Sequence, residues 1–181
     1  MRVIAGQYRG TRLDTPRGVD IRPTADRLRE SIFNIIGQRL PGKRVLDLFA
    51  GTGAMGIEAL SRGASQAVFI DHLPKAIDLI HKNVAKVKAD DLATIISWDI
   101  ARDLRCLCGQ KGFDYIFVDP PYRQGLVQRT LDNLRSADLR FDLIVVEHTI
   151  NEPMGNLADA FVLQDQRRYG KTLVSFLRDM V

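Results

Sequence analysis

The sequence is poor in cysteine and tryptophan and has no long hydrophobic run. Two of its 181 residues are cysteines, Cys106 and Cys108, and no histidine stands near them. This pair supplies neither a zinc-ligand set nor a disulfide framework, so we expect reduced thiols and no metal site. No apolar run approaches a membrane span of about 20 residues. The opening MRVIAGQYRG also lacks a signal-peptide core. We therefore expect a cytoplasmic protein that binds no membrane.

Linkers, internal repeats and low-complexity tracts are missing too, which favours one compact unit. We divide it into a basic extension, residues 1–42, and a main domain, residues 43–181. Residues 1–44 hold ten Lys and Arg against four Asp and Glu, whereas the other 137 hold sixteen against eighteen. A basic front favours a polyanionic partner, although an ordinary solvated surface fits the charge equally well.

From residue 44 onward, apolar segments of strand length alternate with amphipathic helical segments. The expected strands cover residues 45–49, 67–70, 93–97, 113–118 and 141–147, and the expected helices cover 54–62, 74–87, 100–107 and 126–134. This alternation predicts a parallel sheet with right-handed crossovers. Two final strands, 161–169 and 172–177, are joined by only two residues and must pair antiparallel. The fold class is α/β: a Rossmann-like, mainly parallel seven-stranded sheet with a C-terminal antiparallel hairpin.

The first 42 residues predict a short β-hairpin followed by a helix. Loose alternation with turn-forming glycines suggests an irregular hairpin over residues 1–22, with arginines on its exposed face. After Pro23, Thr24 is the expected N-cap of a helix that ends at Pro41. Helical spacing assigns its buried face to Leu28, Ile32, Ile35, Ile36 and Leu40.

The turn Asp119-Pro120-Pro121-Tyr122 follows the apolar strand 113–118. Proline cannot donate to a sheet ladder, so two prolines end the strand and hold a carboxylate and an aromatic ring at its tip. Ligands of parallel α/β sheets bind beyond the carboxyl ends of the strands. We interpret these four residues as the catalytic site. A stiff turn without chemistry is the plainer alternative.

Three further carboxylates follow the other parallel strands. Asp47 opens a glycine-rich loop of the GxGxxG type, Asp71 follows the second strand, and Asp99 follows the third. Asp47 would repel a pyrophosphate but attract an ammonium, while Asp71 can accept from ribose hydroxyls and Asp99 from an adenine amino group. Structural roles stay open: glycines also make tight turns, and Asp71 and Asp99 can cap helices. Together the strand ends indicate a slot for S-adenosylmethionine as methyl donor.

These motifs also carry a family resemblance. DLFAGTGAMGIEALSRGA at 47–64 and DPPY at 119–122 resemble the motifs of S-adenosylmethionine-dependent amino-methyltransferases. With MRVIAGQYRG at the front, IRPTADRLRESIFNII at 21–36 and RRYGKT at 167–172, nearly the whole chain resembles the RsmD family. The resemblance implies an enzyme that methylates the 2-amino group of a guanine in 16S ribosomal RNA.

The resemblance and the motifs together assign the cofactor contacts. The expected contacts are Asp47, Phe49, Ala50, Gly51, Thr52, Gly53, Asp71, His72, Asp99 and Ile100. Three positions depart from the family pattern: Asp71 stands where glutamate is usual, Thr52 where serine is common, and Lys171 where an acidic residue is expected.

The expected RNA contacts lie in the basic front. They are Arg9, Arg12, Arg22 and Arg27. We expect a monomer that acts on 16S ribosomal RNA within an assembling or assembled small subunit. A DNA adenine amino-methyltransferase would share the cofactor motifs and DPPY. A nicotinamide-dependent oxidoreductase could use the glycine loop and Asp71, but Asp47, DPPY and the closing hairpin argue against it.

Overall fold

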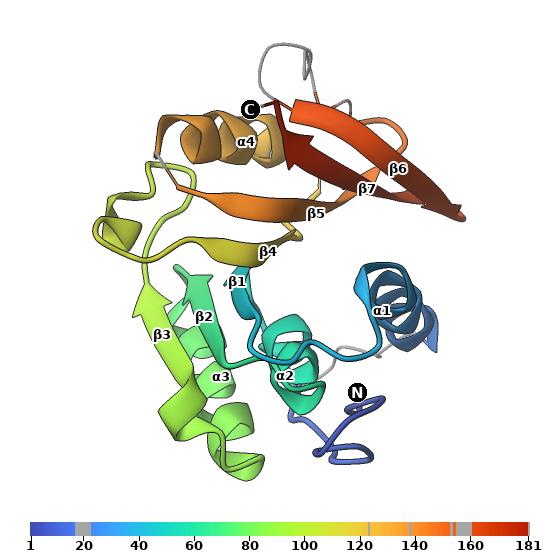
Figure 1. Ribbon diagram of the computed structural model, residues 1–181, viewed down its shortest axis with the longest axis vertical. Helices are drawn as coiled ribbons and strands as arrows, with labels where there is room; N and C mark the ends of the chain where they lie inside the picture. The colour runs from blue at the N-terminus through green and yellow to red at the C-terminus, as the bar shows by residue number, and fades with distance from the viewer. Residues whose placement is uncertain (17–22, 123, 138, 153, 155–160, 181) are drawn as a thin grey trace.

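The computed structural model describes residues 1–16, 23–122, 124–137, 139–152, 154 and 161–180. Within them, one seven-stranded sheet has the order β3-β2-β1-β4-β5-β7-β6 (Figure 1). Its strands are β1 (Arg44–Leu48), β2 (Gln66–Asp71), β3 (Ala93–Ser97), β4 (Phe113–Val118), β5 (Phe141–Thr149), β6 (Phe161–Tyr169) and β7 (Thr172–Asp179). The first five are parallel, and β7 pairs antiparallel with both β5 and β6. The predicted fold class is confirmed.

Helices cover both faces of this sheet. They are α1 (Pro23–Ile36), α2 (Ala54–Ser61), α3 (Pro74–Lys86) and α4 (Leu126–Ser136), with short 3-10 turns at η1 (Asp90–Leu92) and η2 (Arg105–Leu107). Successive strand residues point to opposite faces, so Val45 packs in a core with α1, α2 and α3, while Leu46 packs in a second core with α4. The helices cover the two faces of the sheet, so a ligand can approach the carboxyl ends of the parallel strands.

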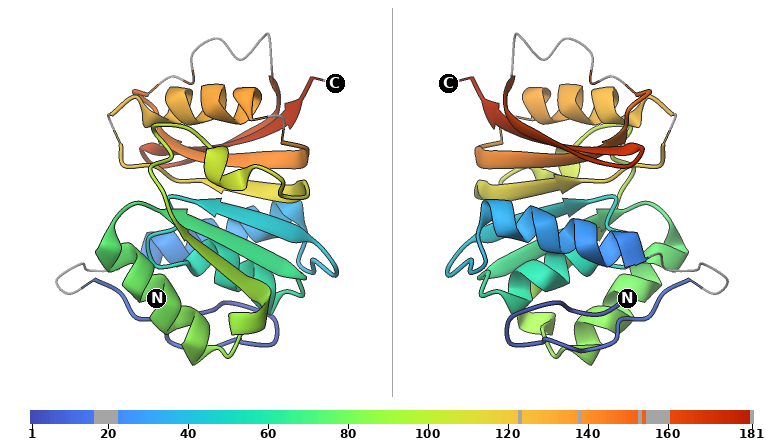
Figure 2. Two further views of the ribbon diagram at one scale, coloured as in Figure 1. Left: turned by 90° about the vertical axis from the view of Figure 1, so that its left-hand side faces the viewer. Right: turned by 90° about the vertical axis from the view of Figure 1, so that its right-hand side faces the viewer.

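The amino-terminal segment differs from its prediction. The expected hairpin is reduced to one antiparallel bridge between Arg2 and Arg12, flanked by backbone hydrogen bonds between residues 1–3 and 10–13. The turn of this loop also binds to α2, because Gln7 donates its backbone N–H to the Ser61 carbonyl and Tyr8 donates its N–H to the Ser61 hydroxyl. In the right-hand view of Figure 2, α1 (blue) lies between this loop (dark blue) and the β6–β7 hairpin (red).

Helix α1 is also shorter than expected. It begins at Pro23, so Thr24 lies in its first turn, and it ends at Ile36 before Gly37, whose φ of 128° leaves the helical region. Ile35, which the spacing placed on the buried face, is 41% exposed, and Phe33 is buried in its place. The helix expected over residues 100–107 is only the turn η2.

The basic front shares the core of the main domain. Val3, Leu13 and Leu28 pack in the same cluster as Val45 and Phe69. None of the described helices is both long and apolar enough to cross a bilayer.

A buried carboxylate joins the amino-terminal loop, α1 and α2. Glu58 is fully buried and accepts the backbone N–H groups of Ile4 (2.8 Å) and Ala5 (3.0 Å). It also pairs with Arg62 at 2.8 Å and with Arg29 at 3.5 Å. One buried side chain therefore contacts the amino-terminal loop, α1 and the end of α2 together.

Removing this carboxylate should be costly. We expect Glu58→Ala to lower the free energy of unfolding by about 3–5 kcal/mol, because the buried Arg62 guanidinium would lose its carboxylate partner and Arg29 would keep only Asp26. Denaturant unfolding measures the change. Glu30→Ala, an exposed change on α1, should stay within about 0.5 kcal/mol of the native protein. Equal effects of the two substitutions would contradict this account of Glu58.

Candidate active site

The carboxyl ends of β1, β4 and β5 face one cavity of about 450 Å³. Its walls also include α1, the loop before α2, and the start of β7. Three acidic side chains line it: Asp47, Asp119 and Glu147. Arg29 is the one Lys or Arg among the described lining residues, and it is already paired with Asp26 and Glu58. The cavity is therefore acidic and suits a cationic ligand.

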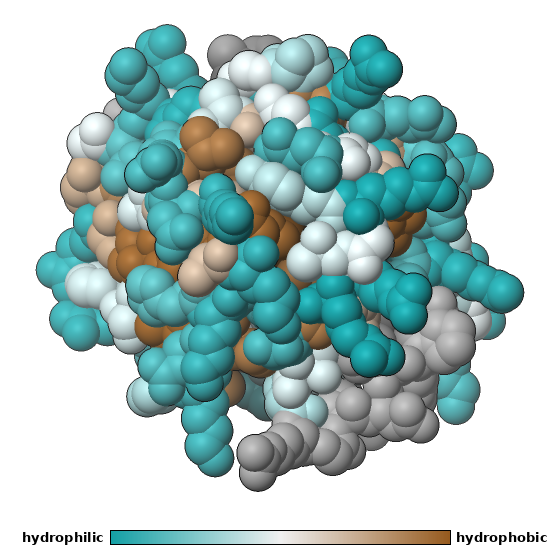
Figure 3. Space-filling view, turned by 90° about the horizontal axis from the view of Figure 1, so that it is seen from below, coloured by the Kyte–Doolittle hydropathy of each residue, from teal (hydrophilic) through white to brown (hydrophobic). Residues whose placement is uncertain are grey.

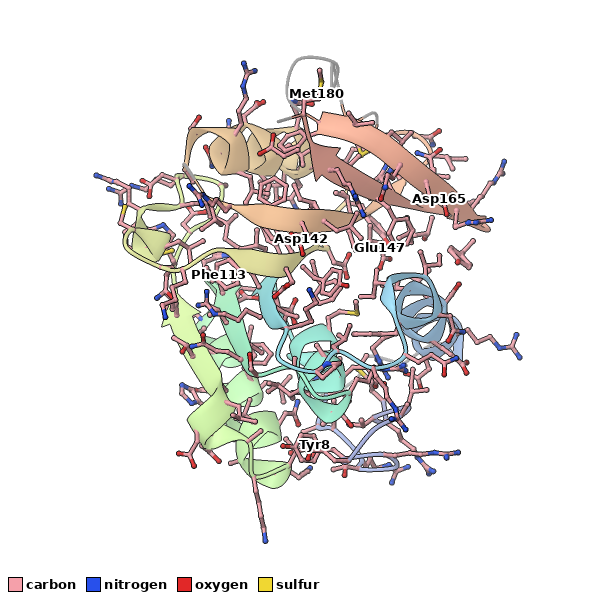
Figure 4. The ribbon with its side chains drawn as sticks, viewed as in Figure 1. Tyr8, Phe113, Asp142, Glu147, Asp165 and Met180 are labelled. Carbon is pink, nitrogen blue, oxygen red and sulfur yellow. The ribbon has the colours of Figure 1, made fainter. Side chains whose placement is uncertain are left out.

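Asp119 and Glu147 are neighbours because β4 and β5 are parallel and in register. Val118 pairs with Val146, so the residues that follow them lie side by side at the sheet edge. Tyr122 closes this group, since its hydroxyl donates to Glu147 Oε1 at 2.7 Å. In Figure 4, Glu147 lies near the end of β5 on the side of the sheet that faces α1. The DPPY turn thus presents a carboxylate and a ring to the cavity.

The glycine-rich loop is built around Asp47. Its conformation requires positive φ angles at Phe49 (60°), Gly51 (55°) and Gly53 (75°), and Gly53 then caps α2. The Gly56 N–H in the first turn of that helix donates to Asp47 Oδ2 at 2.9 Å. This bond ties the end of β1 to the start of α2 and leaves the second carboxylate oxygen of Asp47 for other contacts.

Burial shifts the acid–base properties of this group of carboxylates. Asp47 is 4% exposed, and its burial raises its pKa to about 7, against the opposing effect of the Gly56 hydrogen bond. Asp119 opens to solvent through the cavity, yet the surrounding protein removes water from its carboxyl group and, with the charges of Glu147 and Asp47, raises its pKa well above the usual value. Burial also raises the pKa of Glu147. Loss of water on burial is the largest cause of each pKa shift.

Comparison with known proteins agrees with this arrangement. The family described as "Conserved hypothetical protein 95" matches residues 1–178. The chain is 35% identical to the Bacillus subtilis "Putative rRNA methyltransferase YlbH", covering 98% of each. It is 34% identical to the Escherichia coli "Ribosomal RNA small subunit methyltransferase D", over 94% of this chain and 86% of the relative.

The chain belongs to the RsmD family. A solved structure, "Putative methyltransferase yhhF from Escherichia coli", matches with a TM-score of 0.83 and 31% identity, covering 99% of this chain and 97% of the other. The seven-stranded sheet with its antiparallel end is thus the class I methyltransferase fold of the RsmD family.

The residue at the family's usual glutamate position, Asp71, is occupied with its own loop. Its two oxygens accept the backbone N–H groups of Gly51 (3.0 Å) and Leu73 (2.9 Å). Leu73 is itself the N-cap residue of α3, and no side chain caps that helix, so Asp71 holds the turn before α3 without capping it. Because a carboxylate has further acceptor positions, these two hydrogen bonds do not prevent a contact with a ribose.

A second, shallower hollow of about 290 Å³ lies beyond β2 and β3. His72, Ser97, Trp98, Asp99 and Arg102 line it. Asp99 also accepts the Ala101 N–H at 3.0 Å in the turn that follows β3. Ile100 differs from its expected role: it is 1% exposed and packs in the core on the α4 side, so it offers no surface to this hollow.

The remaining predicted residues are placed as follows. The cavity is lined by Phe49, Ala50, Gly51 and Thr52, whereas Gly53 is buried beneath the loop. Pro120 is buried and Pro121 exposed. Arg9, Arg12 and Arg27 are exposed, and Arg22 lies outside the described residues. In Figure 3, hydrophilic side chains (teal) cover most of the lower face, to which the amino-terminal loop belongs.

Sequence reasoning missed Glu147, Arg29 and Thr172, which also line the cavity. Glu147 had a signal, since it is a carboxylate in the last expected parallel strand. Arg29 had none, because the part of α1 that reaches the cavity depends on how the helix docks.

The buried charge of Asp47 leads to a pH-dependent prediction. Its folded pKa of about 7 exceeds the ordinary 3.8, so the folded state binds the extra proton and wild-type stability falls as pH rises from about 4 to about 7. Asp47→Asn removes this loss and should stabilise the protein above pH 7, by at most on the order of 4 kcal/mol. Thermal unfolding across pH 4–8 tests it.

The same substitution should weaken binding of a cationic ligand, because it removes a negative charge from the cavity wall. Asp78→Asn, on the exposed side of α3, is the matched control for loss of a carboxyl group. If the stability of Asp47→Asn and of the native protein changed with pH in parallel, the prediction would be wrong, because burial would then not penalise the charged form of Asp47.

Proposed function

We propose that this protein transfers a methyl group from S-adenosylmethionine to the 2-amino group of a guanine in small-subunit ribosomal RNA. The observation that carries the proposal is the meeting of Asp47, Asp119 and Glu147 in one cavity beside the DPPY turn. The names of the family relatives in Bacillus subtilis and Escherichia coli support ribosomal RNA as the substrate.

The cavity has the chemistry that the methyl donor requires. When bound, S-adenosylmethionine supplies an electrophilic methyl group, whose bond to sulfur breaks as a bond to nitrogen forms, and sulfur keeps the electron pair. Asp47 and its neighbours provide negative charge for the sulfonium and the ammonium, while Ala50 and Met55 provide apolar contact. Asp71, His72 and Asp99 then extend the site toward the second hollow for the ribose and the adenine.

The DPPY turn activates the amino group by position and charge. The 2-amino nitrogen of guanine is a weak nucleophile because its lone pair is delocalised into the ring. Asp119 and the carbonyl of Pro120 accept its two hydrogens, which lets the nitrogen pyramidalise, and Tyr122 stacks on the base. As nitrogen gains positive charge, Asp119 takes the proton directly or through water.

The substrate strand meets the basic front of the chain. Residues 1–42 form the RNA-binding extension of the methyltransferase domain, residues 43–181. The base must be single-stranded or swung out of its stack to enter the cavity. We propose that the protein acts as a monomer in the cytoplasm, on an assembling or assembled small subunit.

Asp119 provides the direct test of this proposal. Asp119→Ala should keep cofactor binding but reduce labelled-methyl transfer to small-subunit rRNA by about 10²–10⁴-fold, since general-base and electrostatic assistance are lost. Mapping the labelled nucleotide identifies the target guanine. Asp132→Ala, which removes an exposed carboxyl group from α4, should leave the rate unchanged. Transfer at the native rate by the Asp119 variant would refute the mechanism.

The same assay separates the main rival activity. A DNA adenine amino-methyltransferase would label duplex DNA in preference to ribosomal RNA, and the label would be found on adenine. Label on the 2-amino group of a guanine in the RNA is the outcome that the proposed function requires.

The arginines of the front generate a separate prediction. Changing Arg9, Arg12 and Arg27 to glutamine should weaken RNA binding and flatten its salt dependence, because fewer counter-ions are released, while cofactor affinity is kept. Filter binding at several salt concentrations measures the slope.

A matched triple variant controls for total charge. Lys111, Arg135 and Arg140 are exposed; Lys111 and Arg140 precede β4 and β5 at the opposite edge of the sheet, and Arg135 lies in the last turn of α4. Their replacement by glutamine should leave the slope nearly unchanged. Equal slopes for the two triple variants would remove the front from the RNA-binding surface.

A further inference from the structure

Glu147 is the cavity carboxylate that belongs to neither the glycine loop nor the DPPY turn, and the mechanism above gives it no role. It stands on β5 beside Asp119, lines the cavity, and is only partly exposed. The described residues give it one side-chain hydrogen bond, from the Tyr122 hydroxyl at 2.7 Å. An acidic group in such a place costs free energy in the absence of a ligand, because it stands near a second carboxylate and away from bulk water.

Tyr122 relates Glu147 to the position of a bound base. The hydroxyl lies in the plane of the tyrosine ring and points at Glu147, so this carboxylate stands at the edge of the ring. A base stacked on Tyr122 is parallel to the ring and close to it in size. The edge of that base therefore comes within reach of Glu147, while Asp119 remains on the neighbouring strand end.

The Watson–Crick edge of guanine matches a pair of acceptors. Beside its 2-amino group, guanine presents the N1–H donor, whereas adenine and 2-aminopurine present an N1 lone pair in the equivalent position. A carboxylate that accepts N1–H gains a charge-assisted hydrogen bond, and one that faces a lone pair is repelled.

We propose that Glu147 accepts the N1–H of the target guanine while Asp119 holds its amino group, and so selects guanine. The proposal rests on the proposed function and adds a specificity-determining residue to it. Glu147 suits this role better than Asp47, whose carboxylate is bound to the Gly56 N–H beneath the glycine loop and is almost fully buried.

The test compares two bases at the nucleotide mapped by the labelling experiment. Small-subunit rRNA, free or assembled, whichever the native enzyme methylates, carries either guanine or 2-aminopurine at that position through a ligated synthetic segment. Both bases have a 2-amino group, and only guanine has N1–H. The ratio of kcat/KM for the two substrates is measured for the native protein and for Glu147→Gln.

We expect the native enzyme to prefer guanine, and the preference to fall at least tenfold in Glu147→Gln. A neutral glutamine loses the charged acceptor for guanine, yet its amide N–H can donate to N1 of 2-aminopurine. Because intrinsic differences between the bases affect both enzymes alike, the change in the ratio isolates the contact with Glu147.

Tyr122→Phe distinguishes recognition from mere support of the ring. It removes the hydrogen bond to Glu147 but keeps the stacking surface and the carboxylate, so the guanine preference should remain. Thermal unfolding and cofactor binding show whether each variant is folded. An unchanged ratio in Glu147→Gln, or an equal fall of the ratio in Tyr122→Phe, overturns the assignment. If the native enzyme methylates no rRNA, the proposed function itself has failed.

Discussion

Negative charge gathered in one cavity is the constraint on which the rest of the site depends. Asp47, Asp119 and Glu147 come from three adjacent strands, and the nearby Arg29 is committed to Asp26 and Glu58. Burial raises the pKa of each of these carboxyl groups, so the cavity penalises their charged forms. A cationic methyl donor offsets this cost of burying negative charge, so stability and ligand selection have the same origin.

The fold supplies the rigidity that such a site needs. Asp47 is held by the first turn of α2, and Asp71 is held by Gly51 and the start of α3. These hydrogen bonds tie each carboxylate to the segments around it, and Asp47 and Asp71 are themselves paired in the sheet. The structural role and the role as ligand contact are compatible, because each carboxylate has more acceptor positions than its backbone partners use.

The amino-terminal segment is part of this arrangement, although it lies before the sheet in the chain. Glu58 binds the loop to α2, and Arg29 joins the same network while lining the cavity. At the other side of α1, the Ser31 hydroxyl contacts the hydroxyl of Tyr169 near the β6–β7 turn. Helix α1 therefore connects the basic front to the wall of the cavity and to the β6–β7 hairpin.

The sequence by itself determined the α/β class, the antiparallel end of the sheet and the strand ends that carry Asp47, Asp71, Asp99 and Asp119. Those features follow from local periodicity, from short connections and from prolines, which act over a few residues. Only the tertiary structure decided that the front is a loop bound to α2, since its partner Glu58 is more than 50 residues away. It also decided that Glu147 stands beside Tyr122 and that Ile100 belongs to the core. Such outcomes depend on strand order and helix docking, which nearby residues do not encode.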